Sequence, residues 1–266
     1  MQTHSPTRSI RPGNALTLQG WTVLSLRPCG QHGGLRTAAS RHGARMLALS
    51  PFVIEPLQDK NHQIALKQAL AADITIWTSP NAVRAAAALQ SLQAQPGQAW
   101  LAVGSGTRRA LLRAGIKARA PSRMDSEGLL VMSELQDVRA HSIGLVTAPG
   151  GRGMLAPALV ERGAHVIRAD VYARRSIAFS MRALTALDAA LASPHRVLLA
   201  LSSQDALQRL LTARPLGRHA SLADIAVVAA SQRLADFAHN AGFRRIKVAT
   251  SASPSALLQE AASAFV

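Results

Sequence analysis

Four hydroxyl-bearing residues stand where an apolar, strand-like run gives way to a helical pattern: Ser79, Thr107, Ser203 and Ser231. In an open α/β sheet, ligands bind at the carboxyl ends of the strands, where such turns gather. A hydroxyl beside the free backbone N–H groups of a helix start can bind an anion. The same residue types are also common helix N-caps. Each of the four is therefore either a ligand-binding residue or a plain cap, and their recurrence at equivalent places favours ligand binding.

Tyr172 is the only tyrosine in the chain, and it lies in an alternating stretch that runs from Gly163 to Arg175. Alternation of apolar and polar residues predicts a half-buried strand. Because the chain carries similar patterns on either side of this stretch, we expect a hinge strand between two similar lobes. In this interpretation the phenol of Tyr172 faces the gap between them.

Other kinds of site have little support in the sequence. The glycine-rich segments 104–106 and 150–153 complete neither GxGxxG nor GxxxxGK[ST], which argues against a nucleotide loop. No two of the nine histidines have metal-ligand spacing, Cys29 is the only cysteine, and neither a GxSxG elbow nor a carboxylate pair is present. We therefore expect no metal site, and we interpret each histidine as a surface or hydrogen-bonded residue.

The chain is strongly basic, with 30 Lys and Arg against 14 Asp and Glu and a net charge of +16. Such an excess favours anionic partners, although the solvated arginines of a basic proteome would give the same composition. The basic residues are spread along the chain, aromatic residues make up 3%, and no nucleic-acid-binding signature is present, so we expect no nucleic-acid partner. No apolar run approaches the roughly 20 residues that span a bilayer. A single cysteine fits a reducing cytosol, and we expect a cytoplasmic protein without a membrane partner.

Strand-like runs alternate with helical patterns, which predicts parallel sheets covered on both faces. The predicted strands are 21–26, 46–49, 74–77, 100–103, 143–147, 166–174, 197–201, 225–228 and 246–249. Ser79 and Ser203 are 124 residues apart, as are Thr107 and Ser231, which favours a duplicated α/β lobe over two generic α/β units. The Arg- and Ser-rich start predicts a disordered tail over residues 1–19 rather than a transit peptide.

Several motifs in this order resemble the uroporphyrinogen-III synthase family over about residues 20–266. They are Leu26–Arg27–Pro28, Ile76–Trp77–Thr78–Ser79–Pro80–Asn81–Ala82–Val83, Ala102–Val103–Gly104–Ser105–Gly106–Thr107, Ser126–Glu127–Gly128–Leu129–Leu130, Gly150–Gly151–Arg152, Arg162–Gly163–Ala164, Val171–Tyr172–Ala173–Arg174, Ser231–Gln232–Arg233–Leu234–Ala235 and Gly242–Phe243. Their order and spacing together make the resemblance fairly specific.

The resemblance implies two similar, doubly wound α/β lobes with parallel sheets, joined by two antiparallel linker strands, with the active site in the cleft between the lobes. The linkers would be residues 51–57 and 166–175. One lobe would be discontinuous, formed by 20–50 plus 176–266, and the other continuous, formed by 58–165.

The resemblance also implies an enzyme of heme biosynthesis, a cyclising hydro-lyase that works as a monomer without a cofactor. Its substrate would be hydroxymethylbilane, a linear tetrapyrrole polycarboxylate, which is closed into a macrocycle with inversion of ring D through a spirocyclic intermediate. Since the released substrate cyclises without inversion, such an enzyme must above all hold its substrate in one geometry. The alternative is a non-catalytic two-lobe binding protein for a polyanionic small molecule.

By the same resemblance, Tyr172 would give a proton to the departing hydroxyl as a general acid, or would only anchor the hinge. Gly104 would allow close approach of the backbone to the substrate, whereas the equivalent turn at Ala229–Ala230–Ser231 lacks this glycine. The residues expected to bind substrate are Arg27, Ser79, Gly104, Thr107, Ser126, Ser203 and Ser231. Arg27 would either pair with a substrate carboxylate or cap its own strand turn.

Overall fold

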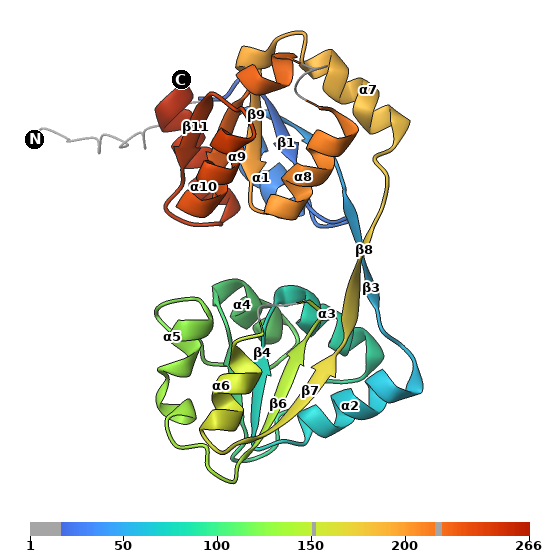
Figure 1. Ribbon diagram of the computed structural model, residues 1–266, viewed down its shortest axis with the longest axis vertical. Coiled ribbons are helices and arrows are strands. Elements are labelled where there is room, and N and C mark those ends of the chain that lie inside the picture. Colours follow the sequence, from blue (N-terminus) through green and yellow to red (C-terminus); the bar gives the residue numbers. More distant parts are fainter. Residues whose placement is uncertain (1–16, 151–152, 216–219) are drawn as a thin grey trace, which may run out of the picture. The chain divides into compact units, whose positions relative to one another are not determined.

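The computed structural model describes residues 17–150, 153–215 and 220–266, which form two compact units (Figure 1). Unit 2 is Ile54–Arg175, and unit 1 comprises the chain up to Val53 together with Ser176–Val266. Of the predicted tail, residues 1–16 lie outside the described residues, and Leu18 is fully buried in unit 1. Two residues of the predicted glycine-rich turn, Gly151 and Arg152, also lie outside the described residues.

Unit 2 is built on a four-stranded parallel sheet with the strand order β5–β4–β6–β7. Figure 1 labels its strands β4, β6 and β7. All four residues of the central strand β4 are buried, as expected where helices cover both faces of a parallel sheet. Because side chains alternate along a strand, Ile74 and Ile76 belong to one core cluster and Trp77 to the other. The strands are β4 (Ile74–Trp77), β5 (Ala99–Ala102), β6 (Ser142–Thr147) and β7 (His165–Asp170).

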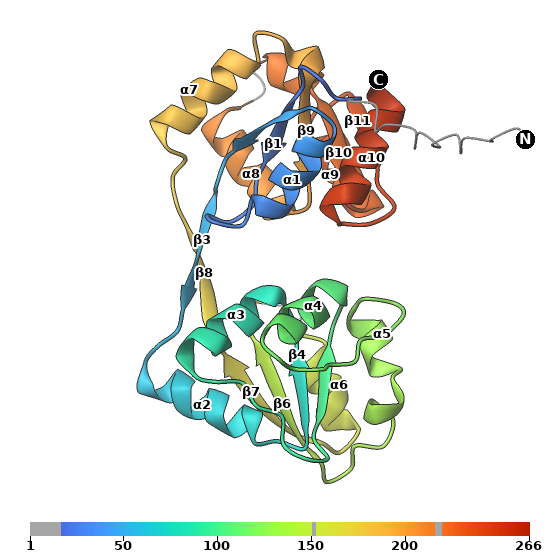
Figure 2. The same cartoon turned by 180° about the vertical axis from the view of Figure 1, so that it is seen from behind.

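Helices cover both faces of this sheet (Figure 2). One core cluster contains residues of α2 (Lys60–Leu70), α3 (Pro80–Leu89) and α4 (Ser105–Arg113). The other contains residues of α5 (Ser126–Leu130), the 3₁₀ turn η1 (Ser133–Leu135) and α6 (Leu155–Glu161). These helices therefore bury apolar residues against the sheet.

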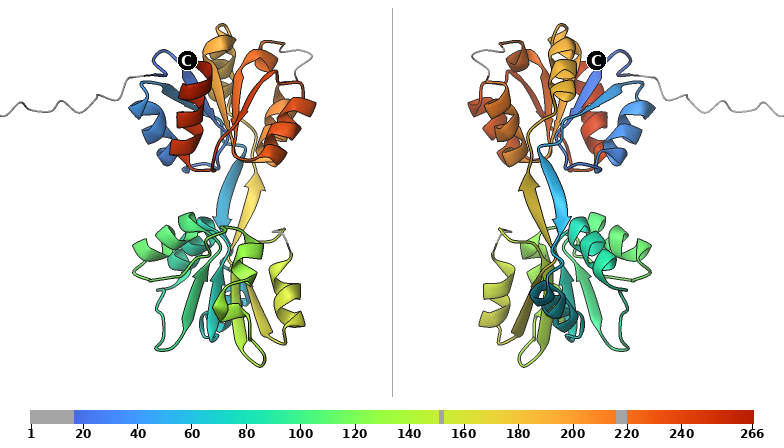
Figure 3. Two further views of the ribbon diagram at one scale, coloured as in Figure 1. Left: turned by 90° about the vertical axis from the view of Figure 1, so that its left-hand side faces the viewer. Right: turned by 90° about the vertical axis from the view of Figure 1, so that its right-hand side faces the viewer.

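Unit 1 repeats this architecture on a five-stranded parallel sheet with the order β11–β10–β9–β1–β2. Helices again lie on both faces (Figure 3). The strands are β1 (Thr22–Ser25), β2 (Arg45–Ala48), β9 (Val197–Leu201), β10 (Ala226–Ala229) and β11 (Arg245–Val248). The helices are α1 (Gly33–Arg41), α7 (Met181–Ala190), η2 (Pro194–Arg196), α8 (Gln204–Ala213), η3 (Ala220–Asp224), α9 (Gln232–Asn240) and α10 (Pro254–Phe265). Two parallel-sheet units confirm the predicted fold class.

The chain passes between the units at β3 (Phe52–Pro56) and β8 (Tyr172–Ser176), which pair in a two-stranded sheet. The Leu57 N–H donates to the Val171 carbonyl, and the Ile177 N–H donates to the Pro51 carbonyl, each over 3.0 Å. Residue numbers increase along β3 while those of the paired residues in β8 decrease, so the two strands run antiparallel.

The structure divides the range 166–175, which the sequence presents as one linker. Val166–Asp170 belongs to β7, which pairs with β6 inside the sheet of unit 2. Only the part from Tyr172 onward pairs with β3. Alternation continues through both strands, so the sequence pattern alone gives no sign of the break at Val171.

Gly144 in β6 lies where α2 approaches the sheet most closely. A Cβ atom at this position would lie 1.9 Å from the Ala69 carbonyl oxygen, a backbone atom that cannot move aside without shifting the helix. We expect Gly144→Ala to lower the free energy of unfolding by about 1–3 kcal/mol, the cost typical of overpacking. Urea unfolding followed by circular dichroism measures this change.

Gly33 provides the control, because a Cβ there would have no atom within 4 Å and its φ is not positive. Gly33→Ala should leave the unfolding midpoint unchanged or raise it slightly. Equal midpoints for Gly144→Ala and the wild type would contradict the close packing of α2 on β6.

Candidate functional site

Ser79 and Tyr172 meet at the carboxyl edge of the sheet in unit 2. Ser79 is the N-cap of α3, and its Oγ accepts a hydrogen bond from the Ala82 N–H over 3.1 Å. The same Oγ lies 3.1 Å from the hydroxyl of Tyr172, the first residue of β8. The structure thus brings together two residues that are 93 positions apart in the sequence.

Either hydroxyl of this pair can donate to the other, and one of the two arrangements leaves the phenolic proton unused. A serine has one O–H to donate and two lone pairs to accept with. One lone pair of Ser79 takes the Ala82 N–H, so its single proton can point to the Tyr172 oxygen. In that arrangement the phenolic proton of Tyr172 is not used by Ser79, and the phenol can donate it to a ligand.

The turn before α4 differs from its sequence prediction. Gly104 is the N-cap of α4, and Thr107 is the third residue of the helix, with only 3% of its surface exposed. Thr107 therefore does not present its hydroxyl on an open turn, because the helix begins at Ser105 rather than after Thr107. The Ser105 N–H points to the sulfur of Met124 over 3.3 Å. Sulfur is a weak acceptor that a ligand oxygen can replace.

Gly104 is not required by the protein's own packing. Its φ of −163° is extended backbone that any residue adopts. A Cβ there would meet the Met124 side chain at 3.5 Å, which is ordinary van der Waals contact. Any need for glycine at this position would therefore come from a ligand that approaches the backbone.

Ser126 is the first residue of α5, and Asp125 caps this helix in its place. The Asp125 carboxylate accepts from the Gly128 N–H over 2.7 Å, and this bond is the largest cause that lowers its pKa. The structure gives Ser126 no capping role, and its part in substrate binding stays a prediction.

Two hydroxyl turns of unit 1 lie at neighbouring strands, because β9 and β10 pair directly. Ser203 caps α8 by accepting from the Ala206 N–H over 3.3 Å. Ser231 stands at the N-cap of α9, yet its side chain makes no capping hydrogen bond. Arg233 Nη1 donates to Gln204 Oε1 over 2.6 Å and so connects the first turns of these two helices.

Arg27 follows β1, is half-buried, and has its pKa lowered by burial. Near it lies His32, which is 7% exposed, with Nδ1 2.8 Å from Ser25 Oγ and Nε2 2.9 Å from Ser50 Oγ. Burial, followed by the charges of Arg36 and Arg27, lowers the pKa of His32. Sequence patterns did not reveal this cluster, and its one signal is the polar Ser25 at the end of an apolar strand.

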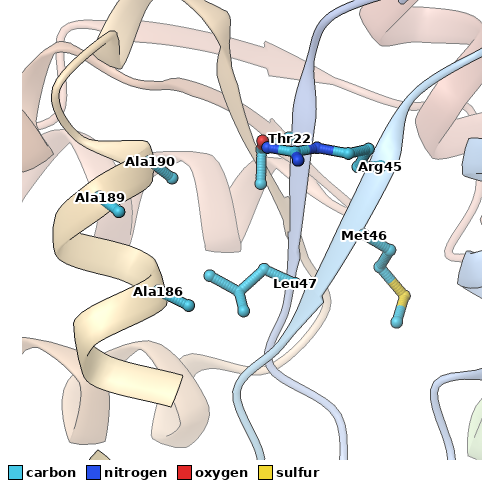
Figure 4. A pocket seen from close by; sticks show the side chains of 7 residues that line it. All are labelled: Thr22, Arg45, Met46, Leu47, Ala186, Ala189 and Ala190. Carbon is cyan, nitrogen blue, oxygen red and sulfur yellow. The ribbon is translucent and has the colours of Figure 1, made fainter. Parts of the chain in front are cut away.

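A separate cavity of about 380 Å³ lies between β2 and α7 in unit 1 (Figure 4). Leu47 points into it toward the alanines of α7, and no predicted site residue lines it. Within the residues that the structure describes, no group of three or more His, Cys, Asp or Glu side chains could hold a metal ion. In the same residues no helix is long and apolar enough to cross a membrane.

The chain matches the family model described as uroporphyrinogen-III synthase HemD over residues 34–259. A mutant uroporphyrinogen III synthase from the extremely thermophilic bacterium Thermus thermophilus has a similar structure, with a TM-score of 0.57, 20% identity, and coverage of 90% of this chain and 96% of that one. For uroporphyrinogen-III synthetase from Helicobacter pylori the TM-score is 0.56 at 18% identity, covering 91% of this chain and 98% of that one. These likenesses show the shared fold, and no curated protein matches the chain.

The lowered pKa of His32 predicts a pH dependence of stability. In the unfolded chain the imidazole takes up a proton near its ordinary pKa of 6.5, whereas in the folded protein it does so only at lower pH. The folded state therefore loses stability as the pH falls below about 6.5 and keeps it above. Urea unfolding at pH 7.5 and pH 5.5 measures the loss, which should be smaller in His32→Gln. Identical pH profiles in the two proteins would contradict a buried, neutral His32.

Proposed function

The chain belongs to the uroporphyrinogen-III synthase family, and from this we propose that it converts hydroxymethylbilane into uroporphyrinogen III. In this reaction the terminal hydroxyl of the linear tetrapyrrole leaves, ring D is inverted through a spirocyclic intermediate, and the macrocycle closes. The loss of water makes the enzyme a hydro-lyase. We further propose that it acts in the cytoplasm as a monomer and without a cofactor.

The observation that carries this proposal is the pairing of Tyr172 with Ser79 at the carboxyl edge of unit 2. The hydroxyl of the substrate's terminal hydroxymethyl group is a poor leaving group until its oxygen is protonated. A phenol held at this edge can supply that proton as a general acid. Since the Ser79 proton can point to the phenol oxygen, the phenolic O–H is free to point to the substrate.

In the proposed step the Tyr172 proton moves to the leaving hydroxyl, the carbon–oxygen bond breaks, and its electron pair departs with the water, which leaves a positive charge on the substrate. The electron pair of the broken phenolic O–H bond stays on the Tyr172 oxygen. Ser79 can donate a hydrogen bond to the resulting phenolate, and bonds to a charged acceptor are stronger than neutral ones. The Ser79 hydroxyl would thus stabilise the charge that develops as the proton leaves.

The first turns of the helices offer binding groups for the carboxylates of the substrate. We propose that Ser79, Gly104, Ser203 and Ser231 contribute hydroxyl or backbone N–H groups there, because the N-terminus of a helix attracts anions. Ser231 is suited to this role since its hydroxyl makes no capping bond. Arg27 would add a positive charge, and the net charge of +16 attracts a polycarboxylate over a longer range. Ser126 would add a hydroxyl in the first turn of α5, whereas the buried Thr107 would act only if substrate binding rearranged its turn.

The proposed function is tested by adding freshly prepared hydroxymethylbilane to the purified protein and separating the oxidised porphyrins by chromatography. The type III isomer should form, and its share should rise with enzyme concentration because the uncatalysed reaction gives type I. Type I alone at every enzyme concentration would refute the synthase activity.

Tyr172→Phe removes the phenolic proton but keeps the ring that packs on the core of unit 2. We expect turnover to fall at least several-fold, and a well-placed general acid typically contributes about 10²–10⁴-fold. Circular dichroism should show unchanged folding. Ser79→Ala is the companion variant and should slow turnover less, because the acid itself remains. Wild-type turnover in Tyr172→Phe would leave Tyr172 with a structural role only.

A further inference from the structure

Two arginines at the carboxyl edges of the sheets are each held by an amide side chain. In unit 2, Arg84 of α3 donates to Oδ1 of Asn81, one turn earlier in the same helix. In unit 1, Arg233 of α9 donates to Oε1 of Gln204, the first residue of α8, over 2.6 Å. A guanidinium has no acceptor, so the amide must present its oxygen in both places.

An amide partner differs from a carboxylate partner in one respect that matters for binding. A carboxylate would orient the guanidinium and also neutralise it. An amide oxygen orients it but leaves its full positive charge and its remaining N–H groups for another acceptor. Arg84 and Arg233 are both accessible to solvent, so a ligand can reach them.

Seven arginines in the described part of the chain are paired with acidic residues, whereas Arg84 and Arg233 are not. These pairs are Arg119–Glu134, Arg123–Asp125, Arg168–Asp170, Arg175–Glu55, Arg209–Asp205, Arg214–Asp188 and Arg244–Asp224. The two amide-held arginines therefore keep their charge beside the proposed site.

Both arginines lie close to residues of that site. Arg233 is two residues after Ser231, whose hydroxyl makes no capping bond. Burial, followed by the charge of Arg113, lowers the pKa of Arg84, and the nearby Tyr172 hydroxyl opposes this shift, so Arg84 is within electrostatic reach of that hydroxyl. A carboxylate bound by Arg84 would thus lie near the group proposed to protonate the leaving hydroxyl.

We propose that Arg84 and Arg233 are carboxylate-binding residues that determine the preference for a polycarboxylate substrate, and that Asn81 and Gln204 are positioning residues that hold them without neutralising them. This inference rests on the proposed function for its substrate. Its chemistry is that of guanidinium–carboxylate pairing at one place in each unit.

The first test replaces each arginine by glutamine and measures KM and kcat for hydroxymethylbilane. Loss of one charge-assisted contact at an accessible position should raise KM by about 3- to 30-fold, with kcat changed far less. The rise of KM with added salt should be shallower than in the wild type, because one screened contact is gone. Arg244→Gln is the control for charge, since Arg244 precedes β11 at the opposite edge of its sheet and pairs with Asp224.

The second test changes only the partner. Asn81→Asp and Gln204→Glu keep the shape of the contact but neutralise the arginine, and an acid in the first turn of a helix favours folding. We expect KM to rise about as much as in the arginine variants, with no loss of stability. Asn61→Asp is the control, because it makes the same substitution at the second residue of α2. Among the described residues no arginine contacts the Asn61 side chain, so KM should change little.

Binding of oxidised uroporphyrin III, followed by quenching of tryptophan fluorescence, separates this inference from the proposed function. If the protein forms only the type I isomer, the synthase proposal fails, while the porphyrin affinities of the same variants still test the arginines. The inference would be overturned if Arg84→Gln and Arg233→Gln had the same porphyrin affinity and the same KM as Arg244→Gln. The role of the amides would be overturned if Asn81→Asp and Gln204→Glu had the same KM as Asn61→Asp.

Discussion

Parallel strand pairing is the constraint on which the candidate site depends. Because all strands of a parallel sheet end at one edge, the turns that start the following helices gather there with their free N–H groups. Ser79 in unit 2 and Ser203 and Ser231 in unit 1 stand on such turns. Tyr172 reaches the same edge because it follows β7, whose last residue is Asp170, by two positions. Strand direction therefore decides which side chains meet.

The fold could be predicted from the sequence because its signals are local. Buried parallel strands are short apolar runs, and hydroxyl residues mark helix starts, as the capping bonds of Ser79 and Ser203 confirm. The sequence pattern places the start of α4 at Thr107, but the helix begins at Ser105, because its N-cap is Gly104, which has no side chain to mark the position. The contacts of His32 with Ser25 and Ser50, and of Arg233 with Gln204, join different elements. Such contacts join residues of different elements and leave no periodic pattern in the sequence, so they could not be predicted from it.

The chemistry of the site matches a reaction that needs positioning more than strong acids or bases. We propose that one phenol with a hydroxyl partner, several helix starts and two arginines held by amides bind the polycarboxylate and protonate one of its oxygens. The amides beside Arg84 and Arg233 orient these two side chains without neutralising them. A carboxylate that pairs with an arginine neutralises the guanidinium. An amide that accepts from an arginine leaves the guanidinium charged, and we propose that this charge binds the substrate.

The carboxyl edges of both sheets are the surfaces that we propose bind the substrate. Amide spectra of ¹⁵N-labelled protein, recorded with and without oxidised uroporphyrin III, test this claim most directly. The largest shifts should fall on N–H groups of the first helical turns, such as those of Ala82, Ser105 and Ala206. Shifts confined to other surfaces, such as the cavity beside Leu47 between β2 and α7, would contradict it.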